Sequence, residues 1–94
     1  MPTYVTLFRY TAEGFKDLSE ARRQHQISLL ESHGGQVKAA YGLMGAWDAL
    51  FITEFPDEQS AMRALLATCQ SGIGTTQTMP ALPLEEFVQL GQRA

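Results

Sequence analysis

Few side chains in this chain of 94 residues have the chemistry that a binding or catalytic site needs. They comprise a carboxylate, a guanidinium, imidazoles, phenols and an indole, namely Asp48, Arg22, His25, His33, Tyr10, Tyr41 and Trp47. We take these residues as the candidate ligand-binding set. Nothing in their spacing assigns a catalytic role to any one of them.

Asp48 is the most unusual member of the set, because it follows Gly45-Ala46-Trp47 at the start of a strand-like run. Aspartate is disfavoured inside strands. A partly desolvated carboxylate beside a sheet could act as a general base or anchor a ligand. Alternatively, Asp48 pairs within the hairpin with Lys38, Arg9 or a backbone N–H near Gly45, as carboxylates beside turns commonly do. The sequence favours local pairing.

Segment 18–33 is a predicted helix without a clear apolar stripe, so two orientations are open. In the first, Arg22, His25 and His33 lie near the sheet and line a pocket for an anionic or carbonyl-bearing ligand. In the second, the helix is rotated and both histidines are exposed. Its buried edge would then consist of Ile27, Leu30 and Arg23.

The remaining motifs predict no cofactor and no metal. His25 and His33 are eight residues apart, about 12 Å along a helix, which is too far for one metal ion to bridge. Ligation of haem by a single histidine has no specific support. The single Cys69 reads as a small buried thiol, and Gly72-Ile73-Gly74 lacks the order of a dinucleotide-binding loop.

The overall composition is that of an ordinary globular domain, with 45% hydrophobic residues and a net charge of −3. No cluster of basic residues beyond Arg22-Arg23 is present, which argues against nucleic-acid binding. No apolar run approaches the ~20 residues of a membrane span, and the N-terminus lacks a signal-peptide pattern. We therefore expect a cytoplasmic protein that does not engage the membrane.

Alternation, capping residues and turn signals predict one domain over residues 1–94 with β-α-β-β-α-β order. A turn is expected near residues 11–14. The predicted strands are 3–10, 36–44, 47–55 and 73–82, and the predicted helices are 18–33, 57–72 and a short one at 84–90. This order is that of the ferredoxin-like fold, an α+β fold with a four-stranded antiparallel sheet and helices on one face. Pro80 places the last strand at an edge.

Both faces of the predicted sheet are apolar, yet helices can cover only one of them. A face with Trp47, Phe51 and Phe8 would be a large apolar patch if it were left in water. We therefore expect a homodimer or larger homo-oligomer in which this face packs against a second copy.

The chain resembles the GYD domain family, small bacterial proteins named after a Gly-Tyr-Asp signature. The resemblance rests on these segments: Pro2-Thr3-Tyr4-Val5, Tyr10-Thr11 with Glu13-Gly14, Gly34-Gly35 with Val37-Lys38 and Tyr41, Gly45 with Trp47-Asp48, and Pro56-Asp57. The departure is Ala46-Trp47 where the signature typically has a tyrosine before the aspartate. The resemblance implies the dimeric α+β barrel type of ferredoxin-like fold and self-association, and it implies no established activity.

Three functions remain open from the sequence. The first is an oligomeric domain that binds a small molecule near Trp47, Asp48, Tyr41 and the polar face of helix 18–33. The second is a cofactor-free oxygenase or isomerase of the dimeric barrel type, in which histidine and Asp48 handle protons. The third is a structural module for self-assembly.

Overall fold

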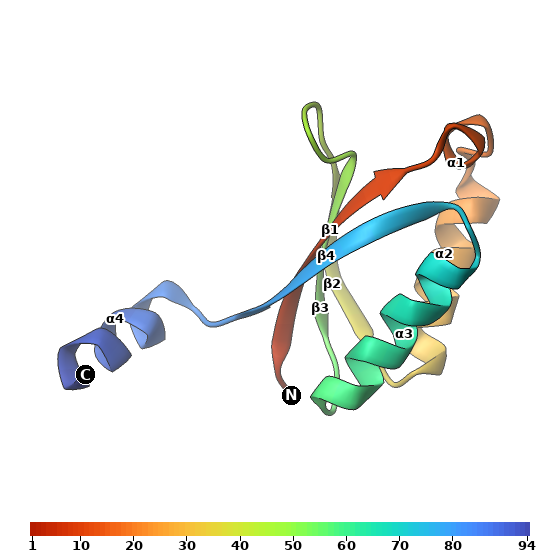
Figure 1. Ribbon diagram of the computed structural model, residues 1–94. Coiled ribbons are helices and arrows are strands. Elements are labelled where there is room, and N and C mark those ends of the chain that lie inside the picture. Colours follow the sequence, from red (N-terminus) through yellow and green to blue (C-terminus); the bar gives the residue numbers. More distant parts are fainter.

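The alternating residues at the start of the chain form a central strand of a four-stranded antiparallel sheet in a computed structural model that describes residues 1–94 (Figure 1). The elements in chain order are β1 (Thr3–Tyr10), α1 (Ala12–Lys16), α2 (Glu20–Ser32), β2 (Gln36–Gly42), β3 (Ala49–Glu54), α3 (Glu58–Gln70), β4 (Gly74–Ala81) and α4 (Leu84–Arg93). The strand order is β2-β3-β1-β4, with all pairs antiparallel. This arrangement confirms the ferredoxin-like fold, and β4 is an edge strand as Pro80 predicted.

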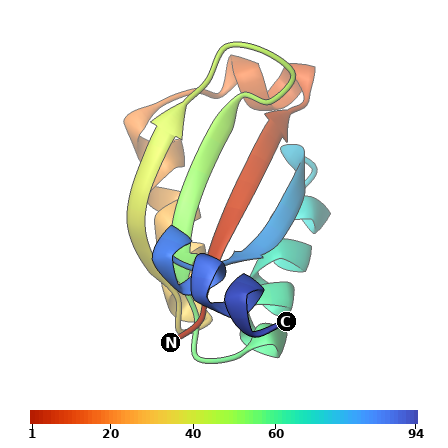
Figure 2. The same ribbon diagram turned by 90° about the vertical axis from the view of Figure 1, so that its left-hand side faces the viewer.

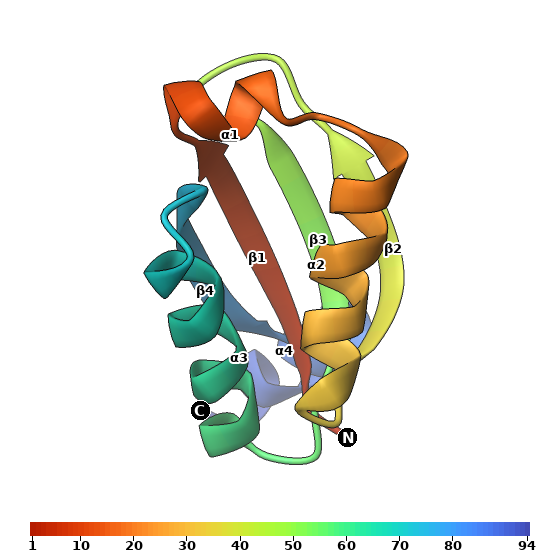
Figure 3. The ribbon, with the colours of Figure 1, turned by 90° about the vertical axis from the view of Figure 1, so that its right-hand side faces the viewer.

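Helices α2 and α3 lie side by side on one face of the sheet (Figure 3). Each begins at a side-chain cap that satisfies a free backbone donor. The N–H of Arg22 donates to Oγ of Ser19 (3.1 Å), and the N–H of Ser60 donates to Oδ1 of Asp57 (2.8 Å). No helix of the chain combines the length and the apolar character that crossing a membrane requires.

The aromatic face of the sheet is the face beneath α2 and α3, which corrects the predicted interface. Phe8 is only 2% exposed, and the register of β1 and β3 places Phe51 opposite Thr6, on the same side as Phe8. Alternation groups the side chains that share a face, but it does not say which face the helices cover. Here the larger aromatic rings fill the layer under the helices. Phe8 and Phe51 are therefore not available to a second copy.

The opposite side, which we call the open sheet face, is mainly aliphatic at its centre and also carries the polar Gln77 beside Leu7. Cross-strand pairing brings together Val5, Leu7, Ala39, Tyr41, Leu50, Ile52 and Met79. No helix packs flat on this face (Figure 2). The C-terminal helix α4 stands away from the sheet on the same side (Figure 1), and none of its residues is buried.

Several element boundaries differ from the sequence prediction. The expected turn at residues 11–14 is the short helix α1, because the N–H of Gly14 donates to Oγ1 of Thr11 as at a helix N-terminus. Strand β2 ends at Gly42 and β3 begins at Ala49, so residues 43–48 form a loop instead of a tight hairpin. Helix α4 continues to Arg93 rather than ending near residue 90.

The position of Phe8 in the core gives a stability prediction. Replacing Phe8 by Ala removes a buried ring and should lower the free energy of unfolding by about 3–5 kcal/mol, measured by urea denaturation. Met44→Ala, at a fully exposed loop position, is the control and should change it by less than about 0.5 kcal/mol. Equal effects of the two substitutions would contradict this placement of Phe8.

Candidate functional site

Asp48 completes the pairing of β1 with the residues before β3. The backbone N–H of Asp48 donates to the carbonyl of Phe8 (2.8 Å), and the backbone N–H of Tyr10 donates to Oδ2 of Asp48 (2.9 Å). The carboxylate thus replaces a strand carbonyl at the point where the ladder stops. The N–H of Leu43 also donates to the Asp48 carbonyl (2.8 Å), which closes the loop 43–48. These bonds explain an aspartate at this position.

Trp47 and Tyr41 lie away from the helices. The guanidinium carbon of Arg9 is 4.8 Å from the centre of the Trp47 ring, and Nε of Arg9 donates to the carbonyl of Ala46 (2.9 Å). Arg9 follows Val5 and Leu7 at two-residue spacing in β1, so it lies on the open sheet face. Tyr41 is on that face and is 60% exposed. Trp47 and Tyr41 therefore lie at the surface of the protein and do not line a site beneath the helices.

Tyr10 and Arg22 meet on the helix side of the sheet, at the end near α1. Both line a small cavity of about 70 Å³. The ring of Tyr10 packs against Phe8, with ring centres 4.8 Å apart, and against Phe15 at 5.3 Å. Burial raises the pKa of Tyr10 above its ordinary value, the Asp48 carboxylate raises this pKa further, and the Arg22 guanidinium opposes both effects. Tyr10 is therefore a neutral hydrogen-bond donor at pH 7.

The two histidines do not join this cluster. His25 is exposed on α2, and Nδ1 of His33 lies 3.0 Å from the carbonyl of Leu29 at the end of the same helix. Helix α2 therefore takes neither predicted orientation. The first is wrong because Arg22 faces the sheet without His25. The second is wrong because Arg23 is exposed and paired with Glu20 (2.9 Å).

Gln26 is a site residue that the sequence analysis missed. It lines the same cavity as Arg22, and its Nε2 donates to Oγ1 of Thr68 on α3 (2.9 Å). Thr68 in turn donates to the carbonyl of Ala64 (3.0 Å). The available signal was the four-residue spacing of Arg22, Gln26 and Leu30, which marks one face of a helix even where two of the residues are polar.

A larger groove of about 410 Å³ lies between α3 and the edge strand β4. Its apolar wall includes Met62, Leu65 and Leu66, and Pro80 closes one side. Cys69 lines it and is exposed, so the expectation of a buried thiol is wrong. Nowhere in residues 1–94 do three His, Cys, Asp or Glu side chains converge as a metal ion would require.

The sequence matches the family described as GYD domain over residues 4–90. The chain belongs to the GYD domain family. A relative of this GYD domain is the glutamine synthetase and cystathionine beta-lyase binding protein of Thermus thermophilus. The two are 28% identical over 91 residues, which cover 94% of this chain and 96% of the relative.

Solved structures share the fold of this GYD domain. The hypothetical protein PHS023 of Pyrococcus horikoshii superposes with a TM-score of 0.57 at 22% identity, over 88% of this chain and 92% of that one. The leucine response regulatory protein LrpA of Mycobacterium tuberculosis superposes with a TM-score of 0.57 at 11% identity. That match covers 87% of this chain and 51% of LrpA. Similarity at these identities establishes the shared fold alone.

The surroundings of Tyr10 give a titration prediction. Tyr10 should titrate above the value of about 10 for a free tyrosine, and folding stability linked to it should be intact below that pH and fall as pH rises through the raised pKa. Asp48→Asn should lower the pKa of Tyr10 and Arg22→Gln should raise it. NMR of tyrosine labelled at Cζ resolves Tyr10 from the other tyrosines, and an unchanged pKa in both variants would refute the cluster.

Proposed function

We propose that this GYD domain protein is a non-catalytic binding protein that forms a homodimer through its open sheet face and associates with other proteins. The observation that carries the proposal is the apolar side of the sheet that the chain's own helices leave uncovered.

The centre of the open sheet face suits a symmetric contact. Val5 and Ile52 are cross-strand neighbours, as are Leu7 and Leu50, so four aliphatic side chains form one patch. Each side chain keeps part of its surface accessible in the single chain. Burial of apolar surface contributes about 25 cal/mol per Å², and a two-fold axis lets the same patch serve both copies.

Helix α4 supplies a second reason for self-association. It has ten residues and no buried side chain, and a helix of this length is marginal in water without a packing partner. Its exposed apolar residues are Leu84, Phe87, Val88 and Leu90. Because α4 stands on the side of the open sheet face (Figure 1), a second copy bound there is well placed to pack against it.

The candidate catalytic groups support binding over catalysis. The Asp48 carboxylate is occupied by the Tyr10 N–H, and the ring of His33 bonds to its own helix. His25 is exposed on α2. The relative named as a binding protein for glutamine synthetase and cystathionine beta-lyase matches nearly its whole length, which supports protein partners of this kind for the present chain.

A charge on the open sheet face should separate the copies. Leu50→Lys should convert the dimer into a monomer at micromolar concentration, because an ammonium group in the centre of an apolar contact is left without a partner. Leu66→Lys, on the opposite side in α3, is the matched control and should stay dimeric. Size-exclusion chromatography with light scattering measures both, and circular dichroism confirms that each variant folds. A wild-type monomer, or a dimeric Leu50→Lys protein, would refute the interface.

Direct binding tests the proposed partners. The purified protein should bind glutamine synthetase or cystathionine beta-lyase from the same organism, with a dissociation constant of about 1–10 µM or tighter, measured by biolayer interferometry. An unrelated oligomeric enzyme serves as the control. Binding that is absent for both enzymes, or equal for the control, would remove this class of partner while leaving the dimer prediction intact.

A further inference from the structure

We infer that the cavity beside Tyr10 and Arg22 binds a small monocarboxylate, with the anion held by Arg22 and Tyr10 and the apolar body held against Phe8 and Phe51. This site lies on the helix side of the sheet within a single chain. It therefore goes beyond the proposed function and does not depend on self-association.

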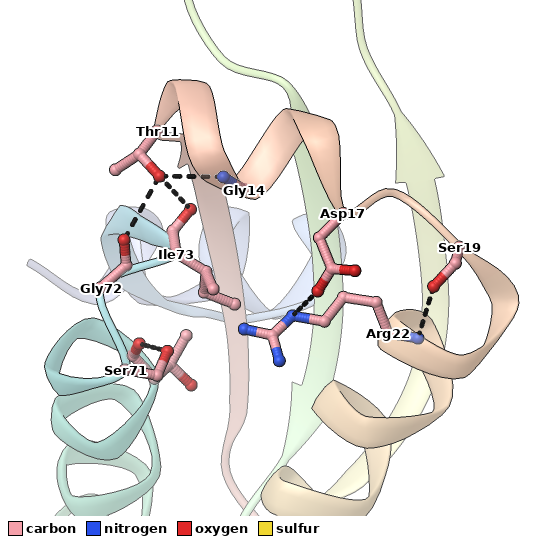
Figure 4. Close-up of polar contacts among 9 residues, drawn as sticks. Thr11, Gly14, Asp17, Ser19, Arg22, Ser71, Gly72 and Ile73 are labelled. Carbon is pink, nitrogen blue, oxygen red and sulfur yellow. Dashed lines mark hydrogen bonds and ion pairs between the residues drawn. The ribbon is translucent and has the colours of Figure 1, made fainter.

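The first observation is a buried donor without an acceptor. Nε of Arg22 is buried and makes no hydrogen bond. Oδ2 of Asp17 forms an ion pair with this atom at 3.7 Å, which is longer than a hydrogen bond, and the Asp17 side chain is 67% exposed. Figure 4 shows the guanidinium reaching from α2 beneath α1, toward the loop at Gly72 and Ile73. A buried donor left unpaired costs about 1–3 kcal/mol, so an acceptor supplied by a ligand would be stabilised here.

The second observation is the chemistry around that donor. A guanidinium remains charged and presents a planar fork that matches a carboxylate. Tyr10 lines the same cavity, and its raised pKa keeps the hydroxyl protonated as a donor. Arg23 also lines the cavity, but it is exposed and pairs with Glu20 (2.9 Å). Arg22 is therefore the lining cation with an unpaired buried donor.

The third observation is the location of the buried polar atoms that have no hydrogen-bond partner. Only two buried side-chain polar atoms of residues 1–94 have no hydrogen-bond partner, Nε of Arg22 and Oγ1 of Thr53. Thr53 lines a second, narrow void that shares Phe8, Gln26 and Phe51 with the Arg22 cavity. The two unpaired groups therefore line adjoining cavities in the layer between the helices and the sheet.

The shape and charge of the cavity narrow the ligand class. Its volume of about 70 Å³ limits the ligand to about the size of acetate or propionate, and Leu18, Phe51 and Ile73 provide apolar walls. The Asp48 carboxylate lies close enough to raise the pKa of Tyr10, so it also opposes a second negative charge on a ligand. A monocarboxylate is thus favoured over a dicarboxylate or phosphate.

The roof of the cavity is held in place by local bonds. Oγ1 of Thr11 donates to the carbonyls of Gly72 (3.2 Å) and Ile73 (3.4 Å) (Figure 4). The N–H of Thr11 also donates to the Ile73 carbonyl (3.0 Å). Gly14 leaves no room for a side chain, since an added Cβ would collide with the Ile73 carbonyl. These contacts join α1 to the turn before β4 over the guanidinium.

An NMR titration of the whole protein with sodium propionate tests the site. Propionate should produce saturable ¹H–¹⁵N shifts at Tyr10, Phe51, Ile73 and the Arg22 Nε–H, whereas 1-propanol and matched sodium chloride should not. Sodium malonate should bind at least several-fold more weakly. Absence of saturable shifts, or equal shifts with 1-propanol, would overturn the proposal.

Matched variants locate the anion. Arg22→Gln should weaken propionate binding about tenfold or more, as expected for loss of a charge-assisted contact. Arg63→Gln, at an exposed position of α3 that does not line the cavity, should leave it unchanged. If Arg22→Gln does not fold, Tyr10→Phe replaces it and should weaken binding several-fold while preserving the ring packing. Wild-type affinity in the variant used, or equal weakening by Arg63→Gln, would overturn the assignment.

Discussion

Two packed helices cover only one face of a four-stranded sheet, so the second face has no packed helix on it. The rest of this structure depends on that constraint. Helices α2 and α3 cover one side and enclose the large aromatic rings, including Phe8 and Phe55, which are almost completely buried. The other side keeps smaller aliphatic side chains and has no cover from its own chain. In our proposal, binding through this second side gives the protein both added stability and a use for its surface.

The covered side is unusual for its polar content. Gln26 and Thr68 bond to each other between the helices, and Thr6 bonds to Thr78 across the sheet (3.0 Å). Polar groups in a small core must find partners, because each unpaired one reduces stability. Most of them do so here, and the two exceptions are Nε of Arg22 and Oγ1 of Thr53. The charged one, at Arg22, distinguishes one cavity from ordinary packing. The same layer thus holds the fold together and leaves one charged donor available.

Much of the fold could be predicted because its signals are local. Ser19 and Asp57 are caps with direct effects on the backbone, and Pro80 limits its strand to an edge. The choice between the two faces could not be predicted, since alternation in β1 and β3 yields two apolar sets of similar size. That is why Phe8 and Phe51 were assigned to an interface that the structure places beneath helices.

The candidate site was harder to predict for physical reasons. Asp48 finds its partner on Tyr10, which is 38 residues away in the chain, so no local pattern encodes the bond. The buried stripe of helix α2 contains the polar residues Arg22 and Gln26. The hydrophobic pattern of the helix therefore does not show which face is buried. The sequence therefore named Tyr10, Arg22 and Asp48 among its candidates but could not separate them from Tyr41, Trp47 and the two histidines.

The central claim is that two copies of the chain pack against each other through the open sheet face. The mass of the native assembly tests this claim most directly. Native mass spectrometry of the unmodified protein should give twice the chain mass of 10.4 kDa at micromolar concentration. A species at the single-chain mass, with no larger assembly, would mean that this apolar face is stable in water and that the proposed interface is wrong.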